Sequence, residues 1–250
     1  MLVNHRRALW YALGLLAAMI LVFLGVGRHP PEAAPLTTVP FIGEWDQGVY
    51  DWVDEVRSEP LTALARVLNV LGGGLVTIPV RIAVAVYLAV VRRWRALSVW
   101  LGTWAVAEIL LAGAKAFFHR GRPPEPLVDV VGYSFPSGHA VAGAATAVAL
   151  VLVLMPAGPR RRRWEWTAAA FAFVMASSRV YLHAHWLSDV VAGVLLGSGV
   201  ALGVAVIATE IRDRALDVGH HAEPPPAEPP TAERPLAEPP PTEPTTAEPI

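Results

Sequence analysis

Three short clusters of polar residues interrupt an apolar sequence, and their residue types suit chemistry on a phosphate group. They supply cations, a hydroxyl, a glycine, two histidines and a carboxylate: Lys115, Arg122, Ser137, Gly138, His139, Arg179, His185 and Asp189. Several positively charged donors around one point match the oxygens of a phosphate. The clusters therefore predict a phosphate-binding site, provided that the fold brings them together.

The backbone of the second cluster, Pro136-Ser137-Gly138-His139, also suits the binding of an anion. Ser137 and Gly138 begin an apolar stretch that we expect to be helical. The first N–H groups of a helix have no acceptor within it, and the helix dipole favours an anion at this end. Glycine lets the anion approach the backbone closely. A phosphate bound at these free N–H groups would lie next to His139.

Two histidines are then available for different tasks. His185 and Asp189 are four positions apart, so their side chains share a face if this turn is helical. The carboxylate would fix the imidazole tautomer and stabilise the imidazolium, which leaves the other ring nitrogen as a nucleophile. His139 would be the general acid for the leaving oxygen and later the base for water. Each histidine alone has a structural alternative, and the joint arrangement favours catalysis.

The neighbouring polar residues have simpler interpretations. Lys115 is the single lysine of the chain, and its alternative role is to extend its ammonium group from a helix end to the membrane surface. We treat His119, Asp129 and His183 as structural or rim residues. Carboxylates do not cluster here, so we expect no magnesium site and no other metal or cofactor.

The composition predicts the elements that must position these clusters. Hydrophobic residues make up 54% and charged residues 16% of the chain, whereas a soluble domain usually carries about 25% charged residues. Six apolar stretches each approach the ~20 residues that a helix needs to cross a bilayer: Ala8–Val26, Leu75–Val91, Ala96–Phe118, His139–Met155, Trp166–Leu182 and Leu187–Thr209. We therefore predict an all-α, polytopic membrane protein, a six-transmembrane-helix bundle, rather than a soluble helical core.

The first stretch has one alternative interpretation, because it follows the basic segment His5-Arg6-Arg7 and so resembles a cleaved signal peptide. Its apolar run exceeds the usual ~7–15 residues of a signal peptide. We expect a retained span.

Arginine placement predicts the orientation of the bundle. Arginines precede the first stretch and follow the second, fourth and sixth, so these connections and both termini are expected in the cytoplasm. By helical rise, Lys115 and His139 each lie ~30 Å, and His185 ~33 Å, from an arginine-rich connection. The site is therefore predicted at the extracytoplasmic surface of the plasma membrane.

Two further segments flank the predicted spans. In residues 41–71, apolar residues recur at helical spacing between acidic ones. This pattern predicts an interfacial amphipathic helix with Trp45 and Trp52 as anchors, and packing against the bundle is the alternative. Residues 222–250 repeat a proline- and glutamate-rich unit, which predicts a disordered cytoplasmic tail. The predicted divisions are 1–40 for the first span and outer linker, 41–210 for the membrane core and 211–250 for the tail.

Two charged residues interrupt the second and third stretches. Arg81 and Glu108 lie ~17 and ~20 Å from the same cytoplasmic connection by helical rise. A lone charge at mid-membrane costs about 3 kcal/mol on insertion scales, so we expect a salt bridge between these antiparallel neighbours. Just before the second stretch, Gly72-Gly73-Gly74 is expected to break or bend the chain.

The three clusters, in this order, resemble the three-part signature of the type 2 phosphatidic acid phosphatase superfamily. The resemblance covers roughly residues 45–205, and Arg120 also resembles a common family position. The matching motifs are Lys115 with Arg122-Pro123, Pro136-Ser137-Gly138-His139, and Arg179 with His185 and Asp189.

This resemblance implies metal-independent hydrolysis of a phosphomonoester or diphosphate through a phosphohistidine. It assigns His185 as the nucleophile, Asp189 as the residue that orients it and His139 as the acid. The residues that would hold the phosphate are Lys115, Arg122, Ser137, Gly138 and Arg179.

We therefore predict an enzyme that acts on the phosphate or diphosphate of a lipid or isoprenoid, such as undecaprenyl diphosphate. Its partners would be this lipid and the bilayer, and a net charge of −1 gives no reason to expect nucleic acid. A lipid phosphotransferase would use the same site, with an acceptor hydroxyl in place of water. A non-catalytic transporter lined by charged residues is the alternative from another class.

Overall fold

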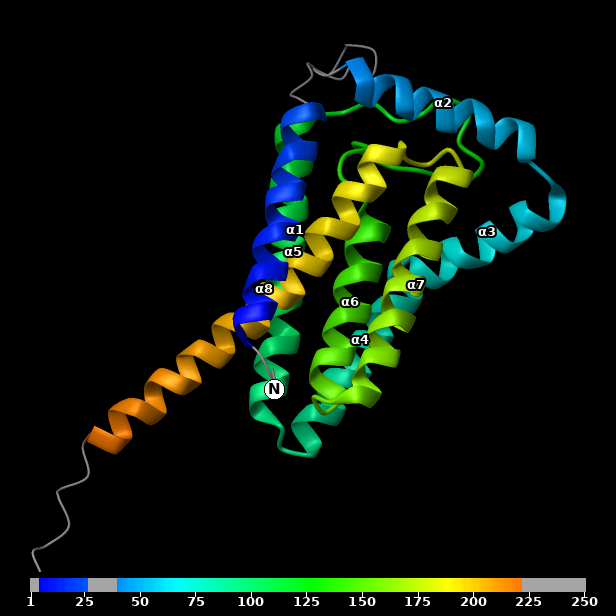
Figure 1. Ribbon diagram of the computed structural model, residues 1–250. Helices are drawn as coiled ribbons and strands as arrows, with labels where there is room; N and C mark the ends of the chain where they lie inside the picture. Colours follow the sequence, from blue (N-terminus) through cyan, green and yellow to red (C-terminus); the bar gives the residue numbers. More distant parts are fainter. Residues whose placement is uncertain (1–4, 27–39, 222–250) are drawn as a thin grey trace, which may run out of the picture. The chain divides into compact units, whose positions relative to one another are not determined.

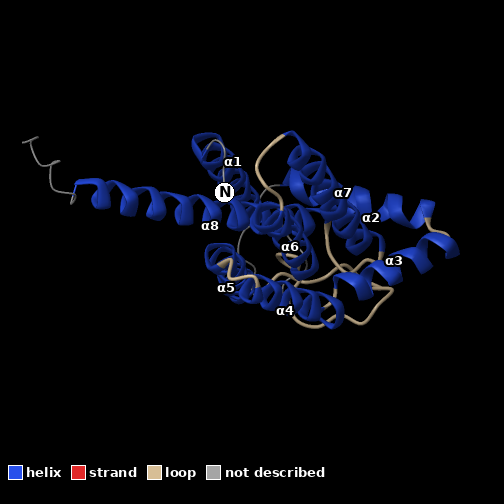
Figure 2. Ribbon diagram, turned by 90° about the horizontal axis from the view of Figure 1, so that it is seen from below, coloured by secondary structure: helices blue, strands red, loops and turns tan. Residues whose placement is uncertain are grey.

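The computed structural model describes residues 5–26 and 40–221, which form helices joined by turns and loops (Figure 1). The helices are α1 (His5–Val26), α2 (Pro40–Val56), α3 (Glu59–Gly72), α4 (Gly74–Val90), α5 (Trp94–Phe118), α6 (Gly138–Leu154), α7 (Pro159–Tyr181) and α8 (Leu187–His221). The described ranges contain no strand (Figure 2), which confirms the all-α prediction.

The outer linker at 27–39 and the repeats at 222–250 lie outside the described residues. The chain divides into two compact units, 1–213 and 214–250, and the predicted site lies within the first.

Each of the six predicted stretches coincides with a helix, but the count of six membrane spans is not confirmed. Within the described ranges, α1, α5 and α8 are long and apolar enough to cross a bilayer, and α3 with α4 would form a fourth span bent by 43°. Helices α4 and α6 have only 17 residues each, which is at the short limit for a spanning helix. Helix α7 begins with four consecutive arginines, which lower its hydropathy.

Helix α6 forms the centre of the bundle, between α5 and α7. Two of its small residues, Ala144 and Ala149, are fully buried. Helix α8 approaches α6 closely because glycines face the backbone of α6. A Cβ added at Gly193 would lie 2.8 Å from the carbonyl oxygen of Ser137, which is too close for an ordinary contact. This approach brings the beginnings of α6 and α8 together.

Helix α2 lies across the end of the bundle at which α5 ends and α6 and α8 begin (Figure 1). Its inner face buries Asp46 and Val53, whereas Trp45 and Trp52 are 56% and 57% exposed on the outer face. The amphipathic helix is thus present with two distinct faces. Val53, one of the apolar residues that recur in 41–71, is turned toward the bundle, away from the two tryptophans.

The predicted break at the glycines lies between α3 and α4, and close packing explains why small residues occur there. A Cβ at Gly72 would collide with the terminal methyl group of Met175 on α7. The same Cβ would lie 3.1 Å from Cδ2 of His139. The break therefore places α3 directly against one of the predicted catalytic histidines.

The predicted salt bridge between α4 and α5 is present. Nη1 of Arg81 lies 3.1 Å from Oε1 of Glu108. Arg81 also donates from Nε to Oγ1 of Thr146 at 3.2 Å and lies over the ring of Trp104. The arginine side chain is only 7% exposed but the glutamate is 58% exposed, so the pair lies at the surface of the bundle and not within it.

Candidate active site

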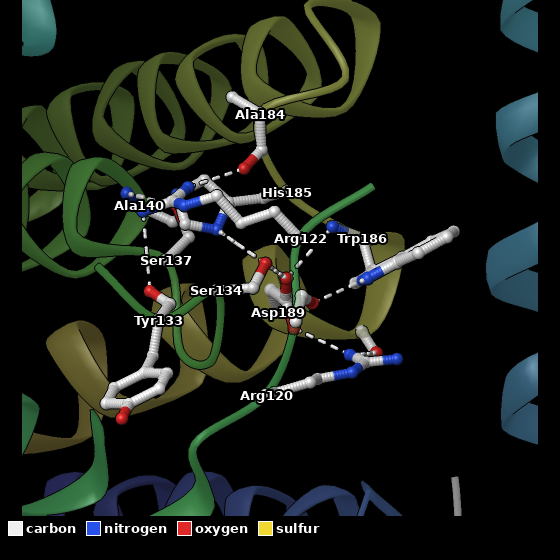
Figure 3. Close-up of polar contacts among 12 residues, drawn as sticks. Arg120, Arg122, Tyr133, Ser134, Ser137, Ala140, Ala184, His185, Trp186 and Asp189 are labelled. Atoms are coloured by element: carbon white, nitrogen blue, oxygen red, sulfur yellow. Dashed lines mark hydrogen bonds and ion pairs between the residues drawn. The ribbon is translucent and has the colours of Figure 1, made fainter. Parts of the chain in front are cut away.

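The three predicted clusters meet at the end of the bundle that α2 covers (Figures 1 and 3). Lys115 comes from the last turn of α5 and Arg122 from the following loop, whereas His139 begins α6. Arg179 ends α7, and His185 lies in the turn before α8. His139 lies within electrostatic range of Arg122, Arg179 and His185. Residues up to 70 positions apart in sequence, from Lys115 to His185, therefore surround one point.

His185 and Asp189 form a buried pair with a defined orientation (Figure 3). Nδ1 of His185 lies 3.5 Å from Oδ2 of Asp189, and both side chains are almost fully buried. The opposite ring nitrogen, Nε2, lies 3.2 Å from Nη1 of Arg122. The carboxylate therefore holds one side of the ring, and the other side faces a guanidinium.

The environment of His185 keeps its imidazole neutral. Burial lowers the pKa of His185 to about 4, although the neighbouring Asp189 carboxylate raises it, and Arg122 and Arg179 lower it further. At neutral pH the Nε2 lone pair is thus available on the side that faces Arg122. A neutral imidazole in this orientation is the form that a nucleophile requires.

Lys115 and Arg122 converge on the loop before α6. The Lys115 ammonium donates to the carbonyl oxygen of Tyr133 at 2.5 Å. Nη2 of Arg122 donates to the same oxygen at 3.3 Å, and Nη1 donates to Ala184 at 2.6 Å. Further donation from Arg122 goes to the carbonyls of Val131 and Gly132. Two cations that suit a phosphate are therefore held in place by neutral backbone oxygens, and a phosphate would compete for both.

The start of α6 partly meets the prediction. The Ser137 hydroxyl caps the helix by accepting from the N–H of Ala140 at 3.5 Å. The Ser137 backbone N–H was predicted to be free for an anion, but it donates to the carbonyl oxygen of Asp189 at 3.0 Å. This bond follows from the close approach of α8. The helix N–H groups left for an anion are therefore those of Gly138 and His139.

Asn69 of α3 contacts two of the predicted residues, and the sequence reasoning missed it. Its backbone carbonyl oxygen lies 3.2 Å from Nε2 of His139. Its side-chain oxygen accepts a hydrogen bond from Nη1 of Arg179. Nε of Arg179 is buried without a hydrogen-bond partner, so a bound phosphate could accept from it. The feature of the sequence that could have revealed Asn69 is a single polar amide side chain between the apolar residues Leu68 and Leu71.

Three further residues hold Asp189. Ser134 donates from its hydroxyl to Oδ2 of Asp189 and lies 3.4 Å from Nδ1 of His185. Nη1 of Arg120 lies 2.6 Å from Oδ1 of Asp189. The N–H of Trp186 also donates to Oδ2 at 2.9 Å. Asp189 is therefore fixed from three directions before any substrate binds.

The residues expected at the rim lie around this centre. The ring of His183 stacks on Tyr50 with 3.9 Å between centroids, and Nη2 of Arg57 lies 3.1 Å from its Nδ1. His119 packs edge-on against Tyr133 at 4.5 Å. Asp129 is exposed in the loop between α5 and α6.

A cavity of about 620 Å³ lies elsewhere, near the start of α5, the end of α6 and residues 208–212 of α8. It is ~28 Å from the cluster by helical rise along α5, so it is separate from the predicted site. In the part of the chain that the structure describes, no group of three or more His, Cys, Asp or Glu residues is arranged to hold a metal ion.

The fold is that of membrane PAP2 phosphatases of known structure. One similar solved structure is a transmembrane PAP2 type phosphatidylglycerolphosphate phosphatase from Bacillus subtilis, with 20% identity and a TM-score of 0.67 over 82% of this chain and 97% of that one. Another is LpxE from Aquifex aeolicus, with 20% identity and a TM-score of 0.53 over 66% and 94%. The fold and the apolar helices indicate an integral membrane protein.

The family comparison agrees. The PAP2 superfamily model matches residues 96–213, a region that contains all three motifs, which bears out the predicted resemblance to this superfamily. A comparison with curated protein sequences gives no match.

Proposed function

We propose that the protein hydrolyses the phosphate or diphosphate group of a lipid or isoprenoid through a phosphohistidine on His185. The observation that carries the proposal is the orientation of that ring. Nδ1 is directed to Asp189 and the unprotonated Nε2 lies 3.2 Å from Arg122. A phosphate held by Arg122 would therefore present its phosphorus to the Nε2 lone pair.

In the first step, the phosphate binds between the cations and the N–H groups of Gly138 and His139. The Nε2 lone pair attacks phosphorus, an N–P bond forms, and the P–O bond to the leaving group breaks. His139 gives its proton to the leaving oxygen. Asp189 stabilises the positive charge of the phosphorylated ring, whose Nδ1 keeps its proton.

In the second step, water replaces the leaving group. His139 now takes a proton from the water, whose oxygen attacks phosphorus. The N–P bond breaks, its electron pair returns to Nε2, and inorganic phosphate leaves. No step needs a metal ion, because Lys115, Arg122 and Arg179 would neutralise the charge of the phosphate oxygens.

The surroundings of the site support a lipid substrate. Helix α2 covers the site and exposes Trp45 and Trp52 on its outer face, and exposed tryptophans favour the level of lipid headgroups. With the arginine pattern of the sequence, this favours a site at the extracytoplasmic surface of the plasma membrane and cytoplasmic termini.

A phosphate-release assay tests the proposal. Purified protein in detergent and EDTA is offered undecaprenyl diphosphate, phosphatidylglycerophosphate, phosphatidic acid and a water-soluble phosphate ester. We expect release from at least one lipid, competitive inhibition by vanadate and acid-labile phosphate on a histidine. His185→Ala should abolish turnover. Full turnover by this variant would refute the assigned nucleophile, and no release from any lipid would refute the function.

A matched reaction with an added acceptor alcohol distinguishes hydrolysis from transfer. The phosphotransferase alternative requires a phosphorylated alcohol as the main product, whereas hydrolysis yields inorganic phosphate under the same conditions.

A further inference from the structure

A second carboxylate joins the site from a distant part of the chain. Nη2 of Arg120 lies 2.6 Å from Oδ2 of Asp46 on α2, and Nη1 of the same guanidinium lies 2.6 Å from Oδ1 of Asp189. The three side chains are between 0% and 3% exposed. One arginine therefore bridges an aspartate of the surface helix α2 and the carboxylate that faces His185.

Asp46 also holds the beginning of α8. Its Oδ1 accepts from the N–H of Ser188 at 2.8 Å, and its Oδ2 accepts from the Ser188 hydroxyl at 2.7 Å. The Ser188 oxygen in turn accepts from Nη1 of Arg120 at 2.7 Å. Both oxygens of Asp46 are thus occupied by donors next to Asp189. An isolated carboxylate would not be buried so completely, because burial of an unpaired charge is strongly unfavourable.

The charges of this network affect His185. A single guanidinium is shared between two carboxylates, so the three groups carry a formal charge of −1 beside the imidazole. If Asp46 were neutral, Arg120 would face Asp189 alone and would cancel more of its field. The other charged or titratable groups that face His185 are Arg122 from the loop, Arg179 from α7 and His139 from α6.

We propose that Asp46 is a positioning residue for the reaction: it holds Arg120 so that Asp189 stays aligned with His185 and keeps its negative charge for the ring. The phosphorylated, cationic imidazole depends on that charge. The proposal rests on the function proposed above. It also means that α2, which exposes its tryptophans on the other face, is tied to the reacting histidine through two ion pairs.

The test compares Asp46→Asn with Asp51→Asn, an exposed aspartate of the same helix whose carboxylate accepts from Gln47. Loss of the hydrogen-bonded partner that orients a metal-binding histidine typically costs about 10–100-fold in activity, and Asp46 acts on His185 at a comparable remove. We expect Asp46→Asn to lower kcat by about that factor with KM within about twofold. Asp51→Asn should match the wild type. Asp46→Glu, which retains the charge, should recover part of the activity.

A second measurement needs no substrate. Titration of the ¹⁵N-labelled histidines by NMR, with His185→Ala to assign the signal, reports the protonation of His185. Removal of a negative charge disfavours the imidazolium, so Asp46→Asn should move this titration to lower pH, and Asp51→Asn should not. A lower melting temperature with unchanged kcat and unchanged titration would show a purely structural role and overturn the proposal.

The two measurements also separate this inference from the function itself. If the wild type releases phosphate from no lipid, the proposed function fails, and the His185 titration still decides whether Asp46 acts on that ring. If the wild type is active and Asp46→Asn behaves as Asp51→Asn does in both measurements, the inference fails and the function stands.

Discussion

The substitution Gly193→Ala tests whether the close approach of α8 to α6 sets the geometry of the site. Gly193 lies one helical turn after Asp189 and faces the backbone at the start of α6. An added Cβ would lie 2.8 Å from the carbonyl oxygen of Ser137 and 2.8 Å from Cβ of Ala140. Ordinary carbon–oxygen contacts begin near ~3.3 Å, and carbon–carbon contacts near ~3.5 Å. The two helices would therefore have to move apart by roughly 0.5–1 Å.

Such a shift acts on both stability and chemistry. Overpacking of a filled interior costs about 1–3 kcal/mol, which thermal unfolding in detergent measures. The movement also separates Asp189 and His185 on one side from Ser137 and His139 on the other. A displacement of ~1 Å at reacting groups costs on the order of 100-fold, so we expect kcat/KM for phosphate release to fall about 10–100-fold.

Gly203→Ala is the matched control, because it makes the same change in the same helix. A Cβ at Gly203 meets no atom within 4 Å. Helix propensity alone favours alanine by at most about 1 kcal/mol, so this variant should keep wild-type activity and equal or higher stability. If Gly193→Ala retained wild-type kcat/KM, or if Gly203→Ala lost as much, the close approach would not be what positions the site.

Because the pKa of His185 is about 4, its protonation should not change kcat/KM between pH 7 and pH 5. The value of kcat/KM should fall only as the pH drops through 4 and protonates the nucleophile. A fall centred near the ordinary histidine pKa of 6.5 would contradict the burial argument. Glu108→Gln leaves the buried Arg81 unpaired, so it should lower the melting temperature in detergent more than Arg81→Gln, which leaves an exposed carboxylate. The double variant should recover part of the loss, and simple addition of the two losses would exclude coupling. Asn69→Ala removes the side-chain partner of Arg179, so vanadate inhibition and substrate binding should both weaken about 10-fold; unchanged inhibition constants would show that Arg179 needs no such support.

The Arg81–Glu108 pair could be predicted from the sequence because the prediction needed only local helix geometry. Helical rise from a shared connection was enough to place the two charges at similar depth, and the structure confirms their contact. The exposure of Glu108 could not be predicted, because the rotation of α5 depends on how its side chains pack against α4 and α6.

The residues that support the site were harder to find. Asp46, Asn69 and Ser134 belong to no motif, and the first two lie within residues 41–71, which were predicted only as an amphipathic helix. Which face of α2 and α3 turns inward depends on where these helices lie over the bundle. That placement is a tertiary property, because an amphipathic pattern is compatible with either lipid or protein on its apolar side.

The sequence by itself determined the helices, their order and which residues we propose to react, because these depend on hydrophobic runs, short spacings and the chemistry of single side chains. Only the tertiary structure decided three sets of contacts. The Ser137 N–H donates to the carbonyl oxygen of Asp189, and Lys115 and Arg122 donate to the carbonyl oxygen of Tyr133. Arg120 forms ion pairs with both Asp46 and Asp189. The physical reason is that each of these contacts joins segments far apart in the chain. Their distances follow from the packing of α2, α6 and α8, where glycines permit an approach that no local pattern specifies.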